Sequence, residues 1–254
     1  MLTGLYLEKK ENIKVIVVLP AFNAYKTLKK TIDDIPPGFV DEIICVDDGS
    51  TDGTYDLAKE LNLVVFKHNE NKGYGANQKT CYDKALDRGA DIVVMLHPDY
   101  QYDPKLVPYF VSYIQDGYFD IMLGSRIRSR REATGNGMPL YKYLGNRFLT
   151  RFENFFTGLM LSEYHTGYRA YSRKVLEGIN YRENSDDFIF DQESLIQAAD
   201  KDFKIGEIPV PVRYFPEASS INLKKSIKYG LEILLLILKF NLHRLSIIKD
   251  KRFL

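Results

Sequence analysis

The sequence has no tryptophan, only two cysteines and no long uncharged apolar run. Cys45 and Cys81 show no metal-binding spacing and no secretory leader precedes them, so a reducing, cytoplasmic compartment is expected. The most apolar late stretch, residues 231–242, is interrupted by Glu232 and Lys239, far short of the roughly 20 apolar residues that a bilayer span needs. We therefore expect no membrane-spanning segment.

The chain also lacks an excess of charge of either sign. Its 35 Lys and Arg residues nearly cancel 34 Asp and Glu residues, leaving a net charge of +1, which disfavours a general nucleic-acid-binding protein. With 254 residues, of which 45% are hydrophobic, the chain is long enough for one large domain with a substantial core. Its function must therefore depend on local features.

Strand-like and helix-like segments alternate along the chain. Strands are predicted at residues 13–20, 41–50, 63–69, 90–97, 119–126, 163–173 and 203–215. Helices are predicted at residues 27–35, 51–61, 74–88, 105–115, 141–161, 191–199 and 223–248, and a basic, glycine-containing loop at 127–139 suits an active-site flap or a disordered excursion. This alternation predicts an α/β fold with a mostly parallel sheet covered by helices on both faces.

Polar clusters follow several of the predicted strands, where ligands of such sheets bind. Asp47 and Asp48 in "CVDDGSTDGT" could hold ribose hydroxyls and base N–H groups, or cap a helix. The segment "HNENKGYGANQKT" is a glycine-rich loop that opens a helix, which suits an anion contact or a plain turn. These two clusters leave both readings open.

A third cluster, "VVMLHPDYQYDP", ends a strand with a histidine and a carboxylate. Asp99 suits a hard divalent cation that carries a nucleotide diphosphate. His97 could be a further ligand, better suited to manganese than to magnesium, or an ordinary hydrogen-bonded residue at a strand end.

Seven segments together carry a resemblance. They are "VVLPAFNAYKTLKKTI", "IICVDDGSTDGT", "HNENKGYGANQKT", "MLHPDYQYDP", "GSRI", "HTGYRAYSRKVLE" and "FDQESLIQAADKDFKIGEIPV". In order and spacing the chain resembles family-2 glycosyltransferases over residues 13–215, and most of all the dolichol-phosphate mannose synthase-like and bacterial polyprenyl-phosphate glycosyltransferases. The resemblance implies a GT-A fold, a single αβα sandwich in which a nucleoside diphosphate sugar lies across the strand ends.

The resemblance also implies residue roles. The donor-binding residues would be Pro20, Phe22, Asn23, Asp47, Asp48, Asn71, Lys72, Gly73, Gly75, His97 and Pro98. The family's "DxDxQ" motif reads His97, Pro98, Asp99, Tyr100, Gln101, with histidine in place of the first aspartate. The implied cofactor is Mg²⁺ or Mn²⁺, held by Asp99 and Gln101 with His97 as the candidate third ligand.

The reacting groups are implied in the same way. Arg126 of "GSR" matches an arginine near the reacting phosphates, and Asp191 and Glu193 match the late acidic motif, which could take a proton from a hydroxyl acceptor. With Asp99 these make up the candidate catalytic set. The candidate acceptor residues are Arg130, Arg131, Thr166, Gly167 and Arg169. For the two flap arginines a solvated charge run is the alternative, and for His165 a core hydrogen bond.

The implied activity is that of a hexosyltransferase that moves a single sugar, with inversion, from a UDP- or GDP-sugar to a polyprenyl or dolichyl phosphate. One alternative is transfer to a saccharide hydroxyl in surface polysaccharide or glycoprotein biosynthesis, and another is a nucleotide-sugar-binding protein without turnover. The processive "QxxRW" motif is absent, which favours single transfer.

The chain is expected to divide into an N-terminal segment (1–12), the catalytic domain (13–220) and a basic amphipathic C-terminal helix (221–254). Such a helix can lie on a membrane surface that carries anionic lipid, or pack on the domain or on the partner of a homodimer. The expected location is the cytoplasm or the cytoplasmic face of the membrane.

Overall fold

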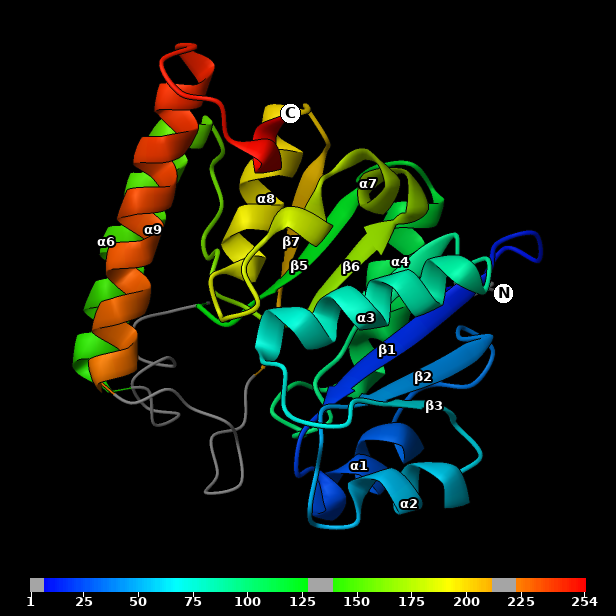
Figure 1. Cartoon of the computed structure of the whole chain (residues 1–254). Coiled ribbons are helices and arrows are strands. Elements are labelled where there is room, and N and C mark those ends of the chain that lie inside the picture. Colours follow the sequence, from blue (N-terminus) through cyan, green and yellow to red (C-terminus); the bar gives the residue numbers. More distant parts are fainter. Residues whose placement is uncertain (1–6, 128–138, 212–222) are drawn as a thin grey trace.

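The computed structural model describes residues 7–127, 139–211 and 223–254, which are built around a seven-stranded sheet of order β3-β2-β1-β4-β6-β5-β7 (Figure 1). The strands are β1 (Val15–Ala21), β2 (Glu42–Asp47), β3 (Val64–Lys67), β4 (Ile92–Met95), β5 (Ile121–Ser125), β6 (Arg169–Ser172) and β7 (Ile205–Pro209). Only β6 runs antiparallel to its described neighbours, β4 and β5. The predicted mostly parallel sheet is confirmed.

Helices cover both faces of this sheet (Figure 1). They are α1 (Tyr25–Asp33), α2 (Thr54–Glu60), α3 (Tyr74–Asp87), α4 (Val107–Gln115), α6 (Leu140–Thr157), α7 (Arg173–Gly178), α8 (Phe190–Asp200) and α9 (Leu223–Arg244), with short 3-10 turns η1 (Pro104–Leu106), η2 (Tyr181–Glu183) and η3 (Lys251–Phe253). Residues of α1, α2 and α4 pack on one face, and residues of α3, α7 and α8 on the other.

The central strand β1 shows why the sheet forms. Its apolar residues alternate between the two faces, so that Ile16 and Val18 join the core under α3 while Val17 and Leu19 join the core under α1 and α4. All four side chains are fully buried. Burial of each such side chain stabilises the fold by roughly 1.5–3 kcal/mol, which makes the continuous apolar run a strong determinant of this strand.

A third apolar cluster joins α6, α8 and α9. Its buried members are Ile189, Ile196, Ile233, Leu236, Ile237, Phe240 and Phe253. Because Phe253 belongs to η3, the chain beyond α9 turns back and packs beside α8. One side of α9 is thus part of the core, as the packing alternative for the C-terminal helix requires.

Several predicted element bounds are wrong. The helix expected at 141–161 ends at Thr157, because Gly158 adopts a left-handed φ of 75° that stops it. The helix expected at 223–248 ends at Arg244. Helix α7 was missed, since its six residues follow β6 directly and are too few for a periodic signal.

Gly75 in α3 offers a test of the packing between α3 and the segment before α8. A Cβ atom at this position would lie 2.3 Å from the carbonyl oxygen of Ser185 and 2.9 Å from the Cβ of Phe190. We expect Gly75→Ala to lower the free energy of unfolding by about 1–3 kcal/mol in urea titrations. The matched control is Gly145→Ala in α6, where a Cβ would meet nothing within 4 Å. A control as unstable as Gly75→Ala would contradict the packing argument.

Candidate active site

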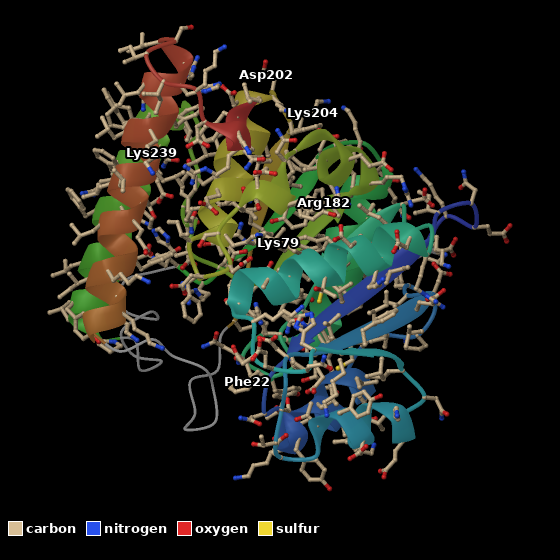
Figure 2. All side chains as sticks on the ribbon, viewed as in Figure 1. Phe22, Lys79, Arg182, Asp202, Lys204 and Lys239 are labelled. Carbon is tan, nitrogen blue, oxygen red and sulfur yellow. The ribbon has the colours of Figure 1, made fainter. Side chains whose placement is uncertain are left out.

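The predicted donor- and metal-binding residues of the first half of the chain lie in or beside the loops that follow β1, β2, β3 and β4. These strands are neighbours and parallel, with β1 between β2 and β4, so their carboxyl ends meet at one edge of the sheet. Phe22 projects from the first of these loops (Figure 2), and its ring is half exposed. Pro20 lies within β1, and Pro98 is a buried residue of the loop that follows β4.

The loop after β1 is clamped to the loop after β2. The Asn23 amide N–H donates to Ser50 Oγ at 2.9 Å, and Asn23 Oδ1 accepts from the Thr51 amide at 3.0 Å. Asn23 has a left-handed φ of 51°, which asparagine tolerates better than most residues. The side-chain oxygen of Asn23 is therefore occupied within the protein, although the residue is exposed, and the exposed ring of Phe22 projects from the same loop.

The two carboxylates at the end of β2 have different surroundings. Asp48 Oδ1 lies 2.6 Å from His68 Nδ1 and accepts from the Lys72 amide at 2.9 Å, while Oδ2 accepts from the Gly73 amide at 3.1 Å. Asp47 accepts from the Ser50 amide at 3.2 Å through Oδ2 alone, and its buried Oδ1 has no hydrogen-bond partner among the described residues. Asp48 thus holds the glycine-rich loop, and Asp47 retains an acceptor oxygen.

The glycines of that loop have a packing reason that the sequence did not show. Gly73 has a φ of 104°, and a Cβ there would lie 2.6 Å from the carbonyl oxygen of Asp186. That oxygen accepts from the Gly75 amide at 2.8 Å, and Lys79 Nζ donates to Asp186 Oδ1 at 2.8 Å (Figure 2 labels Lys79). Asn71 and Lys72 are exposed.

A tyrosine that the sequence analysis did not single out joins the two halves of the site. The Tyr74 hydroxyl lies 2.7 Å from Asp191 Oδ2 and 3.2 Å from His97 Nε2. Gln78 Nε2 donates to Asp191 Oδ1 at 3.1 Å, and Arg169 Nε lies 3.9 Å from the same oxygen. Asp191, at the start of α8, is therefore brought beside His97, which follows β4. In the sequence, only their place in the glycine-rich segment "HNENKGYGANQKT" indicated that Tyr74 and Gln78 could belong to the site.

Burial sets the charge states of these groups. It lowers the pKa of His97, against the opposing effects of the Asp99 and Asp191 charges. Burial, and then the Asp191 charge, raise the pKa of Tyr74 well above its ordinary value. At neutral pH the imidazole is therefore uncharged and the phenol keeps its proton.

The predicted metal ligands do not form a complete cage. Asp99 is half-buried, and its Oδ1 accepts from the Gln101 amide at 3.0 Å, while the Gln101 side chain is buried. Within residues 7–127, 139–211 and 223–254, no three His, Cys, Asp or Glu side chains gather as a metal-binding group. The donor set therefore fits a cation that takes one carboxylate from the protein and most of its oxygens from a diphosphate and water.

Arg126, at the end of β5, is held by a buried carboxylate. Its amide donates to Glu163 Oε2 at 2.7 Å, its Nε donates to Glu163 Oε1 at 2.9 Å, and Asn146 Nδ2 donates to the same Oε1 at 2.9 Å. Burial acts to raise the pKa of Glu163, but the charge and hydrogen bonds of Arg126 outweigh it and lower that pKa. Glu163 was not predicted, and it fixes the direction of the guanidinium.

The turn "HTGYR" packs against the loop after β4. Thr166 Oγ1 donates to the Gly124 carbonyl at 2.6 Å, and the Gly167 amide donates to the Tyr102 hydroxyl at 3.1 Å. A Cβ at Gly167 would lie 2.5 Å from His97 Nε2, so this position has no room for a side chain. His165 Nδ1 lies 3.2 Å from the Tyr229 hydroxyl inside the core.

Two residues with expected roles in the site are buried and paired within the protein. Arg169 has no exposed surface, and its guanidinium donates to the carbonyls of Tyr164, Thr166 and Asp191. Glu193 is also buried, and it accepts from Arg252 at 2.5 Å and from the Ser185 amide at 2.6 Å. Side chains buried and paired in this way support the site and do not contact an acceptor in this conformation. Arg130 and Arg131 lie outside the described residues.

Comparison with known proteins gives a consistent result. Residues 16–179 match the family model described as glycosyl transferase family 2. The chain is 30% identical over 217 residues to a UDP-N-acetylglucosamine–dolichyl-phosphate N-acetylglucosaminyltransferase of Methanococcus voltae, covering 79% of this chain and 86% of that one. It is 33% identical over 200 residues to a dolichyl-phosphate hexose transferase of Haloferax volcanii, covering 78% and 82%.

Among solved structures, the chain is similar to glucosyl-3-phosphoglycerate synthase from Mycobacterium tuberculosis, crystallised with Mn²⁺, UDP-glucose and phosphoglyceric acid. The TM-score is 0.70 at 22% identity, covering 94% of this chain and 82% of that chain. The same synthase was also crystallised with Mg²⁺ and UDP. At this identity the likeness shows the fold, and the fold expected from the sequence is confirmed.

Arg169 supplies a test of the buried charge pair. Its removal would leave the Asp191 carboxylate buried without a compensating cation, so we expect Arg169→Met to lower the free energy of unfolding by about 3–5 kcal/mol in urea titrations. The control is Lys29→Met, which breaks the exposed pair between Lys29 and Asp33 (2.6 Å) and should change stability by at most about 0.5 kcal/mol. Equal effects of the two changes would show that the buried pair is not needed.

Proposed function

Because the chain belongs to glycosyltransferase family 2 and has its GT-A fold, we propose that it is a hexosyltransferase that moves one sugar from a UDP- or GDP-sugar to a polyprenyl or dolichyl phosphate, with inversion. The observation that supports this most is the arrangement of Asp47, Asp99 and Arg126 at the ends of β2, β4 and β5. The family match spans all three. These groups suit, in turn, a nucleoside, a diphosphate-bound cation and a phosphate.

The nucleoside would lie between the loops after β1 and β2. The half-exposed ring of Phe22 offers a face on which a base can stack. The Oδ1 atom of Asp47 has no partner among the described residues but is buried, so it would accept from a ribose hydroxyl or a base N–H only after the groups that cover it move. Asp48, in this proposal, acts through the glycine-rich loop that it holds, and Asn71 and Lys72 of that loop are exposed toward solvent.

The diphosphate would lie beside Asp99. Mg²⁺ or Mn²⁺ bound by this carboxylate would neutralise charge that develops on the leaving nucleoside diphosphate. Arg126, fixed by Glu163, carries a permanent positive charge near the same loops and can stabilise phosphate oxygens directly. The retained Asp99 and the preformed arginine disfavour the alternative of a binding protein without turnover.

The acceptor class follows from Asp191. A hydroxyl acceptor needs a base to take its proton, whereas a phosphate monoester is already ionised at neutral pH. Both Asp191 oxygens are already occupied by hydrogen-bond donors, Tyr74 and Gln78, and Arg169 lies near one of them. Asp191 is therefore better suited to a structural role than to the removal of a proton from the substrate. This favours a phosphate acceptor over a saccharide hydroxyl.

Asp99→Asn tests the reaction. The assay contains Mn²⁺ or Mg²⁺, a panel of UDP- and GDP-sugars and a polyprenyl phosphate. We expect the wild type to release nucleoside diphosphate. The rate of release should fall at least about 100-fold in the variant, because the cation loses its carboxylate ligand. The control is Asp103→Asn, a change in the same segment of a residue that caps η1 through the Lys105 amide. Binding without release by the wild type would favour the non-catalytic alternative.

We also propose that helices α6 and α9 form a membrane-binding face. The two helices lie side by side at one end of the molecule (Figure 1). Each turns one side toward the rest of the fold and leaves large apolar side chains exposed on another. These exposed residues are Leu140, Tyr141, Leu144, Phe148 and Phe155 of α6 and Ile227, Leu231, Leu235 and Leu238 of α9.

Their spacing places each set on one stripe. Positions 141, 144, 148 and 155 of α6, and 227, 231, 235 and 238 of α9, recur every three, four or seven residues. On α6 the opposite side buries Asn146, Thr150 and Glu153, and on α9 it buries Ile233, Leu236, Ile237 and Phe240. Both stripes therefore point away from the domain, where contiguous exposed apolar surface indicates an interaction site.

Charge favours a lipid surface as the partner. Eight Lys or Arg residues and two acidic residues lie between residues 223 and 254, although the whole chain is nearly neutral. Lys239, labelled on α9 in Figure 2, lies beside the apolar stripe, a position that suits contact with anionic headgroups. No described helix is long and apolar enough to cross a bilayer. We therefore propose peripheral binding at the cytoplasmic face, where a lipid phosphate acceptor would be presented.

Flotation tests this face. We expect the wild type to float with vesicles that contain phosphatidylglycerol, and the triple change of Leu231, Leu235 and Leu238 to Gln to weaken binding about tenfold or more, because inserted apolar area is lost. The control is the double change of Tyr109 and Tyr113 to Gln. Both tyrosines are exposed on α4. A wild type that forms a stable dimer in sedimentation and does not float would assign the face to a second copy of the chain.

A further inference from the structure

Tyr74 contacts two groups of the proposed site at once, yet no role has been assigned to it. Its ring is stacked with that of His97, with centroids 5.5 Å apart and an interplanar angle of 13°. We propose that Tyr74 is a positioning residue that holds His97 in one tautomer, with its proton on Nε2 and its lone pair on Nδ1. The inference deepens the proposed glycosyltransferase function, because His97 stands where the family motif has an aspartate.

The tautomer follows from a count of protons. The Tyr74 hydroxyl has one proton, and the Asp191 carboxylate, 2.7 Å away, can only accept. The phenol oxygen is then left as an acceptor for the second contact. His97 Nε2, at 3.2 Å from this oxygen, must therefore be the donor and carry the imidazole proton. A neutral imidazole has one ring proton, so in the neutral ring Nδ1 holds the free lone pair.

The surroundings of Tyr74 prevent other arrangements. Phe188 packs on the tyrosine ring with centroids 4.9 Å apart. Gly167 lies so close that a Cβ there would be 2.5 Å from His97 Nε2 and 3.4 Å from the Tyr74 hydroxyl. No metal or phosphate can approach Nε2 from that side. Asp191 is in turn held by Gln78, so the proton acceptor of Tyr74 does not move away.

The consequence concerns the site beside Asp99. The lone pair on Nδ1 makes this nitrogen a hydrogen-bond acceptor or a neutral metal ligand. The aspartate of the family motif would instead supply an anionic oxygen at this position. Imidazole nitrogen suits transition metals better than it suits Mg²⁺, so a cation bound by His97 and Asp99 would favour Mn²⁺. An orienting partner on the other ring nitrogen is a common feature of histidine ligands, and its loss typically weakens metal binding by 10–100-fold.

The experiment reads the tautomer directly. Long-range ¹H–¹⁵N spectra of the four histidines, with His97 assigned by its absence in His97→Gln, should show a protonated Nε2 and an unprotonated Nδ1 at pH 8 in the wild type. In Tyr74→Phe, which keeps the ring contacts and loses only the hydroxyl, the two nitrogen signals should move toward each other as the tautomers mix. Calorimetric binding of Mn²⁺ with UDP or GDP should weaken about tenfold.

The matched control is Tyr181→Phe. This change also removes the hydroxyl of a buried tyrosine. That hydroxyl donates at 2.5 Å to the carboxylate of Asp83, which lies in α3 as Tyr74 does, but it does not contact His97. It should change neither the His97 signals nor Mn²⁺-dependent binding. A wild-type His97 with its proton on Nδ1, or signals and Mn²⁺ affinity that are the same in Tyr74→Phe, would overturn the proposal. Because the spectra need no sugar transfer, failure of the proposed reaction would leave this test intact.

Discussion

The buried contact between Arg169 and Asp191 is the constraint on which the site depends. Arg169 begins β6, the one antiparallel strand within the described part of the chain, and Asp191 lies in the first turn of α8. A buried carboxylate is stable only where a cation and hydrogen-bond donors compensate its lost hydration. Arg169 supplies the cation, and Tyr74 and Gln78 of α3 supply the donors. One charge pair thereby joins the second half of the chain to α3 and, through Tyr74, to the loop after β4.

The C-terminal region continues this linkage toward the surface. Gln192 Nε2 donates to the Tyr229 hydroxyl of α9 at 2.6 Å, Lys228 pairs with Asp187 at 2.8 Å, and Arg252 pairs with Glu193. Residues on both sides of Asp191 are therefore held by α9 or by the turn that follows it. The apolar stripe proposed to bind a membrane belongs to the same helix. Membrane binding by α9 would therefore act, through these direct contacts, on the segment that carries Asp191.

Much of the fold could be predicted from the sequence, because continuous β-branched runs such as that of β1 determine buried parallel strands locally. The family motifs likewise predicted which loops form the site, and the comparisons confirm the family and its fold. The roles of single atoms could not be predicted. Tyr74 meets Asp191 across 117 positions of sequence, and Glu163 meets Arg126 across 37, and no periodicity encodes such pairs. The reason for glycine at positions 73 and 75 lies in the backbone of residues 185–186, which a local pattern cannot show.

Asp47 and Asp48 are adjacent in the motif but differ in their hydrogen bonds within the protein. Both are carboxylates at the end of β2, and a motif alone treats them as equivalent partners of a nucleoside. Each carboxylate oxygen can accept about two hydrogen bonds, and a donor already in place leaves less capacity for a ligand. Asp48 accepts from two loop amides and lies within hydrogen-bond distance of a histidine nitrogen, whereas one oxygen of Asp47 has no partner among the described residues. Both oxygens of Asp191 likewise accept hydrogen bonds, which leaves this carboxylate poorly placed to take a proton from a hydroxyl. This supports the proposed phosphate acceptor, because an ionised phosphate brings no such proton.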